Sequence, residues 1–396
     1  MSEDFYHNGL YYRIDEDNSK EVMVVKSKPE ALFRKLVIPQ YINITGQRYK
    51  VSSLQPFALY RCNIIEQIIL SKNLRKIHPQ AFVGCERLSQ IEINPENSYY
   101  RSIDGIVYDK DLKKLVYYPS AHPAPRYFIP ESIEIIGDYA CGLNRNLRNL
   151  HIPDSVKFIG VESFVSCSNL LSISGGTGIE VIGRRAFLHC VQLHRLPIFP
   201  SLQKFDDDAF GYTAVTTVNI PARCQYVKAS AFSGCPNLKK FDVDTENEYY
   251  TTRDGVLYSR DMTILYNFPP AHNGTSYTIP DSVTKIGDYA FFAASRLSEI
   301  KISSKKLHSI GHKAFSYTGI HTLTLPAIDF VQSNMLLYTD ISCITMQGET
   351  PPNAFGRDLL PTDILLRVPF GCKKKYENAS GYWCDRKVEE YYPDEE

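Results

Sequence analysis

Cysteine is the reactive residue type with the most regular spacing in the chain, and that spacing bears on whether its chemistry is used. Five of the ten cysteines recur at one position of a repeated pattern, and other copies hold a small or polar residue there (Cys62, Cys85, Cys167, Cys190 and Cys235; Asn144, Thr213, Ala294 and Thr318). A position that accepts Cys, Asn, Thr or Ala favours a small, buried, weakly polar group, so we expect inert thiols. Adjacent copies could bring Cys62 near Cys85, or Cys167 near Cys190, but Cys235 has no cysteine in either flanking copy. With no C-x-x-C motif, a zinc or redox site is not indicated.

Two further cysteines, Cys372 and Cys384, lie outside the repeats on either side of Trp383, the only tryptophan. They would form a disulfide if the protein is exported and stay as free thiols if it is not. The sequence leaves both alternatives open.

The other groups capable of chemistry do not gather. His151, His194 and His321 fall on predicted strands in different copies of the pattern, facing away from the core. Parallel strands lie about 4.8 Å apart, so these histidines are too far from one another to form one site. No Ser, Cys or carboxylate in the same copy of the pattern is arranged with any of them as in a catalytic triad. The acidic run at 206–208 lacks further Ca²⁺ ligands, and the glycine-rich segment 174–178 lacks the Lys-Ser/Thr and the helix of a phosphate loop. We therefore predict no catalytic residue, no metal site, no cofactor and no enzyme activity.

Composition narrows the class of protein. The 396 residues carry 44 basic and 44 acidic side chains without long runs of one sign, which argues against a nucleic-acid partner. No apolar run approaches the roughly 18–20 residues of a membrane span, so membrane insertion is not expected. The start, MSEDFYHNGL, has no apolar segment typical of an export signal. Either the protein stays in the cytoplasm or an export segment is absent from the sequence given, and the sequence leaves both alternatives open.

The elements that position all these residues are set by a repeat of about 23 residues. Around Phe82 an apolar residue lies five positions before, alanine one before and cysteine three after, followed by Leu-x-x-Ile-x-Ile. The same pattern recurs with Phe57 opening the series, two extra residues before its cysteine, and with these later anchors: Cys141, Phe164, Phe187, Phe210, Phe232, Phe291 and Phe315. A unit this short cannot bury its own apolar face, but stacked units can. The pattern predicts a β-rich solenoid of about nine coils with one strand each.

Two gaps between anchors, from Phe82 to Cys141 and from Phe232 to Phe291, both span 59 residues, one period plus 36. The extra residues are copies of one another, PENSYYRSIDGIVYDKD at 95–111 and TENEYYTTRDGVLYSRD at 245–261, set 150 residues apart. Asp-Gly between aromatic, β-rich flanks is typical of a tight hairpin turn. We expect β-hairpin insertions at about 94–129 and 244–279. The remaining divisions are an N-terminal β cap at 1–50, the solenoid at 51–326 and a C-terminal cap at 327–396, with a short final helix near CKKKYENASGYW.

The segments IPDSVKFIGVESFVSCSNLLSI (152–173) and IPDSVTKIGDYAFFAASRLSEIKI (279–302) resemble the BspA-like class of leucine-rich repeats. The Asp-Gly insertions and both ends are similar to that family as well, so the resemblance covers essentially the whole chain. It implies a leucine-rich-repeat-type array in a bacterial protein that is exposed at the cell surface or secreted, and that binds or adheres without catalysis. The chain departs from the family in lacking an export signal and from the common leucine-rich consensus in lacking an asparagine ladder.

Two surfaces are candidates for binding. The first is the outward-facing side of the predicted strands, which carries mixed polar side chains suited to hydrogen-bonding a protein or glycan (Gln90, Glu92, Asn149, His151, Arg195, Thr217, Asn219, Lys240, Asp242, Glu299 and Lys301). The second is the tyrosine-rich hairpins (Tyr99, Tyr100, Tyr108, Tyr249, Tyr250 and Tyr258), because tyrosine is a frequent interface anchor. Each candidate has a structural alternative. The sheet face would simply be solvated, and the tyrosines would pack each hairpin onto its coil. The function expected is protein or glycan binding in adhesion; the alternative is a cytoplasmic interaction scaffold.

Overall fold

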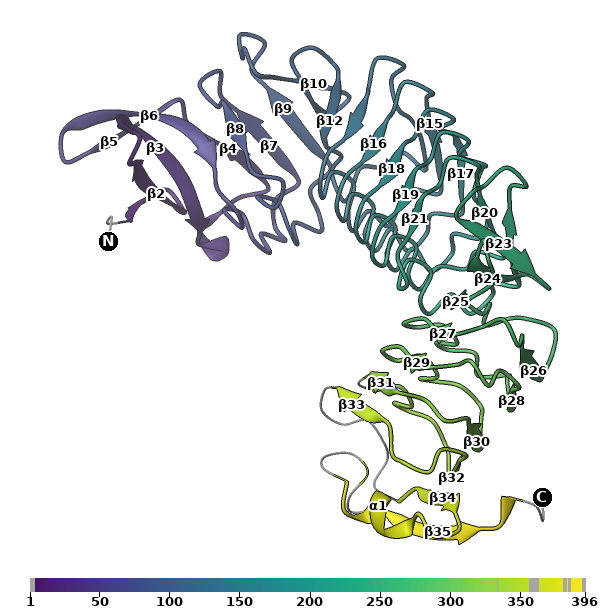
Figure 1. The fold of residues 1–396 in the computed structure, drawn as a ribbon. Helices are drawn as coiled ribbons and strands as arrows, with labels where there is room; N and C mark the ends of the chain where they lie inside the picture. Colours follow the sequence, from purple (N-terminus) through teal and green to yellow (C-terminus); the bar gives the residue numbers. More distant parts are fainter. Residues whose placement is uncertain (1–3, 333, 356–362, 380–382, 384–385, 394–396) are drawn as a thin grey trace. The chain divides into compact units, whose positions relative to one another are not determined.

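The structure is a computed structural model and describes residues 4–332, 334–355, 363–379, 383 and 386–393. It divides into two compact units, residues 1–210 and 211–396, which are described separately. Both are β-solenoids with about 23 residues to a turn, about 14 turns in all, and almost no helix (Figure 1). The solenoid prediction is therefore confirmed, and the predicted number of nine coils is too small.

The first unit begins with an antiparallel cap. Strands follow the order β1-β2-β3-β6-β5, in which only the β3–β6 pair is parallel. The alternating pattern of LYYRI leaves Leu10 and Tyr12 buried and their neighbours in contact with solvent. The elements of the cap are β1 (Phe5–His7), β2 (Leu10–Asp15), β3 (Asn18–Ser27), η1 (Pro29–Ala31), β5 (Tyr41–Ile44) and β6 (Gln47–Leu54).

Most turns of the first unit contribute two strands rather than the single strand we expected. The longer strand is the Leu-x-x-Ile-x-Ile segment, and its partners pair in parallel at a step of 23 residues, as in Ile68 to Ile91 and Leu150 to Ile173. We call this series the long-strand ladder: β4 (Lys35–Val37), β7 (Gln67–Leu70), β9 (Gln90–Ile93), β13 (Arg126–Phe128), β15 (Asn149–Ile152) and β17 (Ser172–Gly175). The short-strand ladder comprises β8 (Lys76–Ile77), β12 (Lys114–Tyr117), β14 (Ile135–Ile136), β16 (Phe158–Ile159), β18 (Val181–Ile182) and β19 (Lys204–Phe205).

The second unit repeats this plan. Its long-strand ladder contains β20 (Thr217–Ile220), β22 (Lys240–Val243), β26 (Ser276–Ile279), β28 (Glu299–Ile302), β30 (Thr322–Leu325), β32 (Cys343–Met346), β34 (Leu365–Pro369) and β35 (Lys387–Tyr391). Its shorter strands are β21 (Tyr226–Val227), β25 (Ile264–Asn267), β27 (Lys285–Ile286), β29 (Ser309–Ile310), β31 (Phe330–Gln332) and β33 (Asn353–Phe355). Pairing runs in parallel from β30 through β35, so the ladder continues beyond residue 326, where we placed the C-terminal cap. The expected short helix is α1 (Lys373–Glu377).

The anchors stack along the core of each unit. The rings of Phe164, Phe187 and Phe210 follow one another with centroids 5.0 Å apart and planes within 3° and 9° of parallel. Most anchor amides donate to the carbonyl of the residue before the next anchor, as in Phe164 N to Ala186 O at 2.8 Å. The residues two before and two after most anchors have positive φ, which folds the chain tightly around the buried side chain.

This geometry shows that the first anchor is not Phe57, the residue we expected. Leu59 donates its amide to Ala81 O at 2.9 Å and is fully buried, whereas Phe57 is 46% exposed with a φ of 59°. The anchor is therefore Leu59, and Cys62 follows it by three residues, the same spacing as from Phe82 to Cys85. Two apolar residues two apart fit the pattern equally well, and only the left-handed turn at Phe57 decides which side chain points inward.

The structure of the two 36-residue insertions also differs from the prediction. Only a short hairpin projects in each, β10 (Tyr100–Ile103) with β11 (Ile106–Asp109) and β23 (Tyr250–Arg253) with β24 (Val256–Ser259). The rest is a further solenoid turn, anchored by Tyr118 or Phe268, whose amides donate to Ala140 O and Ala290 O at 2.6 Å. The sequence pattern did not predict these turns for two reasons. Tyrosine replaces the usual anchor in one of them, and in both the strand before the anchor (β12 or β25) lies closer to it than in other turns. Ile129-Pro130, which matches Ile152-Pro153, was the signal that could have revealed the turn.

Candidate binding surfaces

The repeated cysteine position serves the backbone. Cys85, Cys167 and Cys190 donate their thiols to carbonyls one turn earlier at 3.0 to 3.1 Å, and Asn144 donates its amide to Pro119 O at 2.9 Å. Every described cysteine except Cys343 is buried, and burial raises the pKa of Cys235 to about 11. The burial expected at the repeated cysteine position is confirmed, and the inertness of these thiols stays a prediction. Cys384, and with it the question of a bond to Cys372, lies outside the described residues.

The remaining chemical candidates are accounted for by structure. In the acidic run, Lys204 pairs with Asp206 at 2.8 Å and Arg185 with Asp208 at 3.6 Å. Within the described residues no group of three or more His, Cys, Asp or Glu side chains could hold a metal ion. The glycine-rich segment allows close packing between turns, since a Cβ on Gly175 would lie 2.2 Å from Ile152 O.

Each hairpin is held at its base by a buried asparagine. Asn97 donates to Ser71 O at 3.0 Å and to Leu74 O at 2.8 Å, and its Oδ1 accepts from the amides of Tyr99 and Tyr100 at 2.8 Å. In the second unit Asn247 makes the same four bonds at 2.7 to 2.9 Å (with Pro221, Cys224, Tyr249 and Tyr250). A fully satisfied buried amide fixes the direction in which the hairpin leaves the solenoid.

The turn of the first hairpin rests against the edge of the long-strand ladder. Asp104 and Gly105 have φ values of 51° and 78°, as a tight two-residue turn requires, which confirms the hairpin predicted from Asp-Gly. Gly105 O accepts from the Ile91 amide at 2.9 Å, and His122 Nε2 lies 3.1 Å from Asp104 O. Burial lowers the pKa of His122, which favours the neutral ring that donates to this carbonyl. The second hairpin repeats the contact at Gly255.

The hairpin tyrosines divide into two groups. Tyr99 and Tyr249 are 51% and 45% exposed and are available to a partner. The prediction is wrong for the buried side chains of Tyr108 and Tyr258, whose hydroxyls bond those of Tyr127 and Tyr277 in the added turn. Tyr100 and Tyr250 also have structural roles, because their hydroxyls accept from the amides of Ile77 and Val227 at 3.2 and 2.9 Å. Packing of the hairpin onto its coil is therefore the role of these four.

The predicted sheet-face residues lie on strands of the long-strand ladder, except Arg195, which forms an isolated parallel bridge with Ser172. Those that are exposed are Gln90, Glu92, Arg195, Lys240, Glu299 and Lys301; those that are partly exposed are Asn149, His151, Thr217, Asn219 and Asp242. Many bond within the ladder, for example Asn149 to Ser172 at 2.8 Å and Lys240 to Asp242 at 3.0 Å. The structure thus presents a polar face whose side chains are held in place by their neighbours.

Sequence reasoning missed one aromatic residue on this face. Phe128 on β13 is 69% exposed, pairs in register with His151, and its ring lies 5.8 Å from the imidazole. It was assigned to the hairpin insertion, so its strand was not placed in the ladder. An exposed aromatic beside polar side chains is the type of residue that anchors a partner.

In the second unit the predicted sheet face and the turn of the hairpin line one pocket, which none of the predicted hairpin tyrosines lines. Its volume is about 460 Å³, and its lining includes Thr217, Lys240 and Asp242 from the sheet face, Asp254 and Gly255 from the hairpin turn, and His272 from the added turn. His272 Nε2 lies 3.0 Å from Asp254 O, which holds the turn against this pocket. A polar hollow with charges of both signs suits a ligand rich in hydroxyl or amide groups.

Stacked parallel strands, buried anchors and a polar outer face define a leucine-rich-repeat solenoid. The chain belongs to the family of the BspA type leucine rich repeat region, whose model matches residues 30–121, 123–245 and 266–352 in six copies. No curated protein matches the chain. Among the described residues no helix has both the length and the apolar character needed to cross a bilayer.

Several solved structures are similar to the chain at low sequence identity. A leucine rich cell surface protein from Faecalibacterium prausnitzii A2-165 is 17% identical, with 98% of this chain and 95% of that one covered and a TM-score of 0.52. A leucine-rich repeat protein from Bacteroides ovatus ATCC 8483 is 18% identical over 98% and 100% of the two chains, with a TM-score of 0.45. The pneumococcal vaccine antigen PcpA is 16% identical over 98% and 99%, with a TM-score of 0.44. At these identities the likeness concerns the fold alone.

Proposed function

We propose that this protein is a non-catalytic repeat protein that binds a protein or glycan partner through the outer face of its long-strand ladder, in adhesion or another surface interaction. The observation that carries the proposal is the pocket in the second unit, where Lys240, Asp242 and the turn at Asp254 line one polar hollow. Side chains on paired strands lose little freedom when a partner binds, which lowers the cost of recognition. Proteins of this family are generally binding scaffolds, and the neighbour from Faecalibacterium is described as a cell surface protein.

Charge reversal tests the surface. The purified protein would be screened against arrays of glycans and of extracellular protein fragments, and each hit titrated against Lys240→Glu and Asp242→Lys. Both variants should weaken binding, because each breaks the ion pair of 2.8 Å and alters the pocket. Lys306→Glu, a charge reversal at an exposed position outside the strands and the pocket, is the matched control and should bind like the unaltered protein. Hits that survive both face variants would show that the partner binds elsewhere.

The alternative is a cytoplasmic interaction scaffold. It is favoured by the thiols of Cys85, Cys167 and Cys190, which donate to backbone carbonyls, because reducing compartments keep cysteine in the thiol form. Fractionation of the source cells and protease treatment of intact cells distinguish the two. Loss of the protein on protease treatment would support surface adhesion. Protection, with the protein in the soluble cytoplasmic fraction, would refute adhesion and leave the scaffold.

A further inference from the structure

In the added turn of the first unit, the segment between the short strand and the anchor is shorter than in the neighbouring turns. In the next turn Ile136 and the anchor Cys141 are separated by four residues, but Leu115 and the anchor Tyr118 are separated by only two. The residues that bulge outward at 137–140 therefore have only Val116 and Tyr117 as counterparts. This deletion leaves a notch between the turn that carries Phe82 and the turn that carries Cys141.

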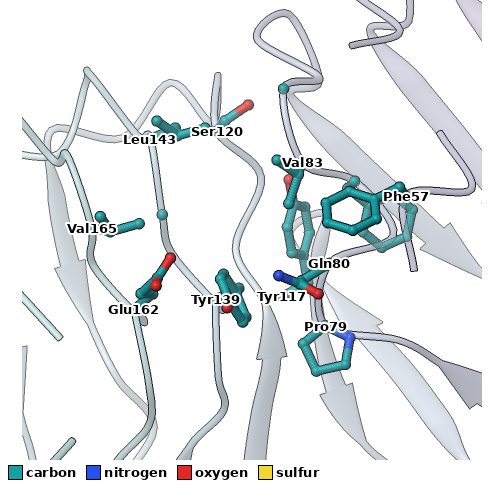
Figure 2. A pocket seen from close by; sticks show the side chains of 13 residues that line it. Phe57, Pro79, Gln80, Val83, Tyr117, Ser120, Tyr139, Leu143, Glu162 and Val165 are labelled. Atoms are coloured by element: carbon teal, nitrogen blue, oxygen red, sulfur yellow. The ribbon is translucent and has the colours of Figure 1, made fainter. Parts of the chain in front are cut away.

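The notch is a pocket of about 290 Å³ with a firm apolar floor. Phe82 and Tyr117 lie at its base, 1% and 6% exposed, with ring centroids 4.7 Å apart. Figure 2 shows Phe57 and Val83 on one side and Val165 and Leu143 on the other. Ser120, which also lines the pocket, donates its hydroxyl to Cys85 O at 2.6 Å, so this donor already has a partner within the protein. The pocket is at the small end for ligand sites, which run from roughly 300 to 1,000 Å³.

The second copy of the internal duplication shows which side chain can stand at the position of Gly142, directly after the anchor. The residue after the anchor is Gly142 in the first copy, where it lines the pocket, and Phe292 in the second, 150 residues later. Phe292 is 8% exposed, and its ring lies 5.4 Å from that of Tyr289 and 5.3 Å from that of Tyr317. Tyr289 is the counterpart of Tyr139, another wall of the pocket. In the second copy, the residue that replaces Gly142 is thus an aromatic ring packed beside the counterpart of Tyr139.

The rim of the pocket adds a polar preference. Gln80, Tyr139 and Glu162 lie around the opening (Figure 2). The Glu162 carboxylate is held by Arg185 at 3.6 Å and keeps 20% of its side chain exposed. An acceptor at the rim suits the hydroxyl of a phenol above an apolar floor. A sugar would lose hydrogen bonds to water on that floor without regaining them, which is costly.

We propose that this notch, lined by Phe57, Phe82, Val83, Tyr117, Tyr139 and Gly142, is a binding pocket for a phenylalanine or tyrosine side chain of a protein partner. The proposal rests on the proposed function in that it takes the ring to belong to a bound protein. Insertion of an aromatic anchor into a preformed apolar pocket is the usual way in which a small area supplies much of the affinity of an interface. The pocket lies wholly within the first unit, so it can succeed or fail as a site independently of the polar pocket at Lys240.

The test uses the full chain and the side-chain analogue p-cresol, followed by N-acetyl-L-tyrosinamide, with saturation-transfer NMR to detect binding and titration to measure it. We expect dissociation constants on the order of 1 mM for such small probes. Gly142→Phe should fill the pocket and weaken binding about tenfold or more. The new Cβ would meet Val165 Cγ1 at 3.1 Å, a contact that a small shift of the valine relieves. Leu188→Phe is the matched control, because Leu188 also follows its anchor and does not line the pocket; it should bind like the unaltered protein.

Two further variants keep the outcome decisive. Val83→Asp places a charge on the wall and should abolish binding even if Gly142→Phe fails to fold. Phe292→Gly should open the corresponding position of the second unit and add a second binding site. The proposal is overturned if neither probe binds the unaltered protein, or if Gly142→Phe binds as well as Leu188→Phe. It is also overturned if methyl α-D-glucopyranoside binds there instead of the phenols, which would assign the pocket to a glycan. None of these results bears on the partner of the sheet face.

Discussion

Replacement of Asn97 by alanine should be among the most damaging single substitutions in the first unit. The side chain is fully buried and makes four hydrogen bonds, two as donor to Ser71 and Leu74 and two as acceptor from Tyr99 and Tyr100. Alanine would leave two carbonyls and two amides without these partners where the hairpin joins the solenoid. Because the amide satisfies both the preceding turn and the hairpin, its loss affects both.

The size of the effect follows from the count of bonds. At about 1 kcal/mol for each net hydrogen bond, Asn97→Ala should lower the free energy of unfolding by about 3–4 kcal/mol. Asn97→Asp should be at least as harmful, because a carboxylate oxygen would face the carbonyls of Ser71 and Leu74. Asn94→Ala is the matched control: Asn94 accepts one exposed bond from the Glu96 amide at 2.9 Å, so its loss should cost about 1 kcal/mol or less.

Urea unfolding measures the loss, and hydrogen exchange locates it. Solenoids unfold by segments, so exchange of the Tyr99 and Tyr100 amides is the more direct reading. Both should exchange much faster in Asn97→Ala than in Asn94→Ala. Asn247→Ala repeats the experiment in the second unit and should give a loss of the same size. A loss below about 1 kcal/mol with unchanged exchange would refute the reasoning that these four bonds hold the hairpin.

Three other predictions concern the core and the turns. Cys167→Ala should cost about 1–2 kcal/mol because a buried carbonyl loses its donor, and Cys167→Ser should cost less because the hydroxyl can still donate; a serine variant less stable than the alanine variant in urea would count against this. Gly175→Ala should cost more than about 2 kcal/mol, since its φ is 74° and the Cβ would lie 2.2 Å from Ile152 O, and an unchanged melting temperature would contradict it. Burial lowers the pKa of His122 below 6.5, so the unfolded chain binds the proton first and stability should fall as the pH drops through 6.5. Urea titrations across this range should show a smaller fall in His122→Asn, and an equal fall would refute the assignment.

The repeat itself could be predicted because it is local. An apolar anchor, a small residue before it and a strand after it recur at a constant step, and stacking is the arrangement that buries all of these faces together. The hairpins follow from the same kind of signal: Asp104 and Gly105 have the positive φ values that their residue types favour. The buried polar position of the cysteines was likewise visible, since the residue types that replace one another there share size and hydrogen-bonding capacity.

Other features depend on contacts between turns that no local pattern records. Both Phe57 and Leu59 fit the anchor position by composition, and the handedness of the turn selects Leu59. Tyrosine suits an interface and a core equally, and Tyr108 is buried only because Tyr127 of the next turn lies against it. Local sequence identifies a side chain's chemistry, whereas its exposure depends on the turns above and below.

The sequence by itself determined the period, the two hairpins, the family and the polar character of the outer face, because each depends on residue types within one 23-residue unit or on their repetition. The tertiary structure alone decided the number of turns, the burial of the hairpin tyrosines and the placement of Phe128 on the sheet face. It also decided that a two-residue deletion beside Gly142 opens a pocket over Phe82 and Tyr117. The physical reason is that a cavity is formed by groups from several stacked turns, so its shape depends on how those turns pack rather than on any one of them.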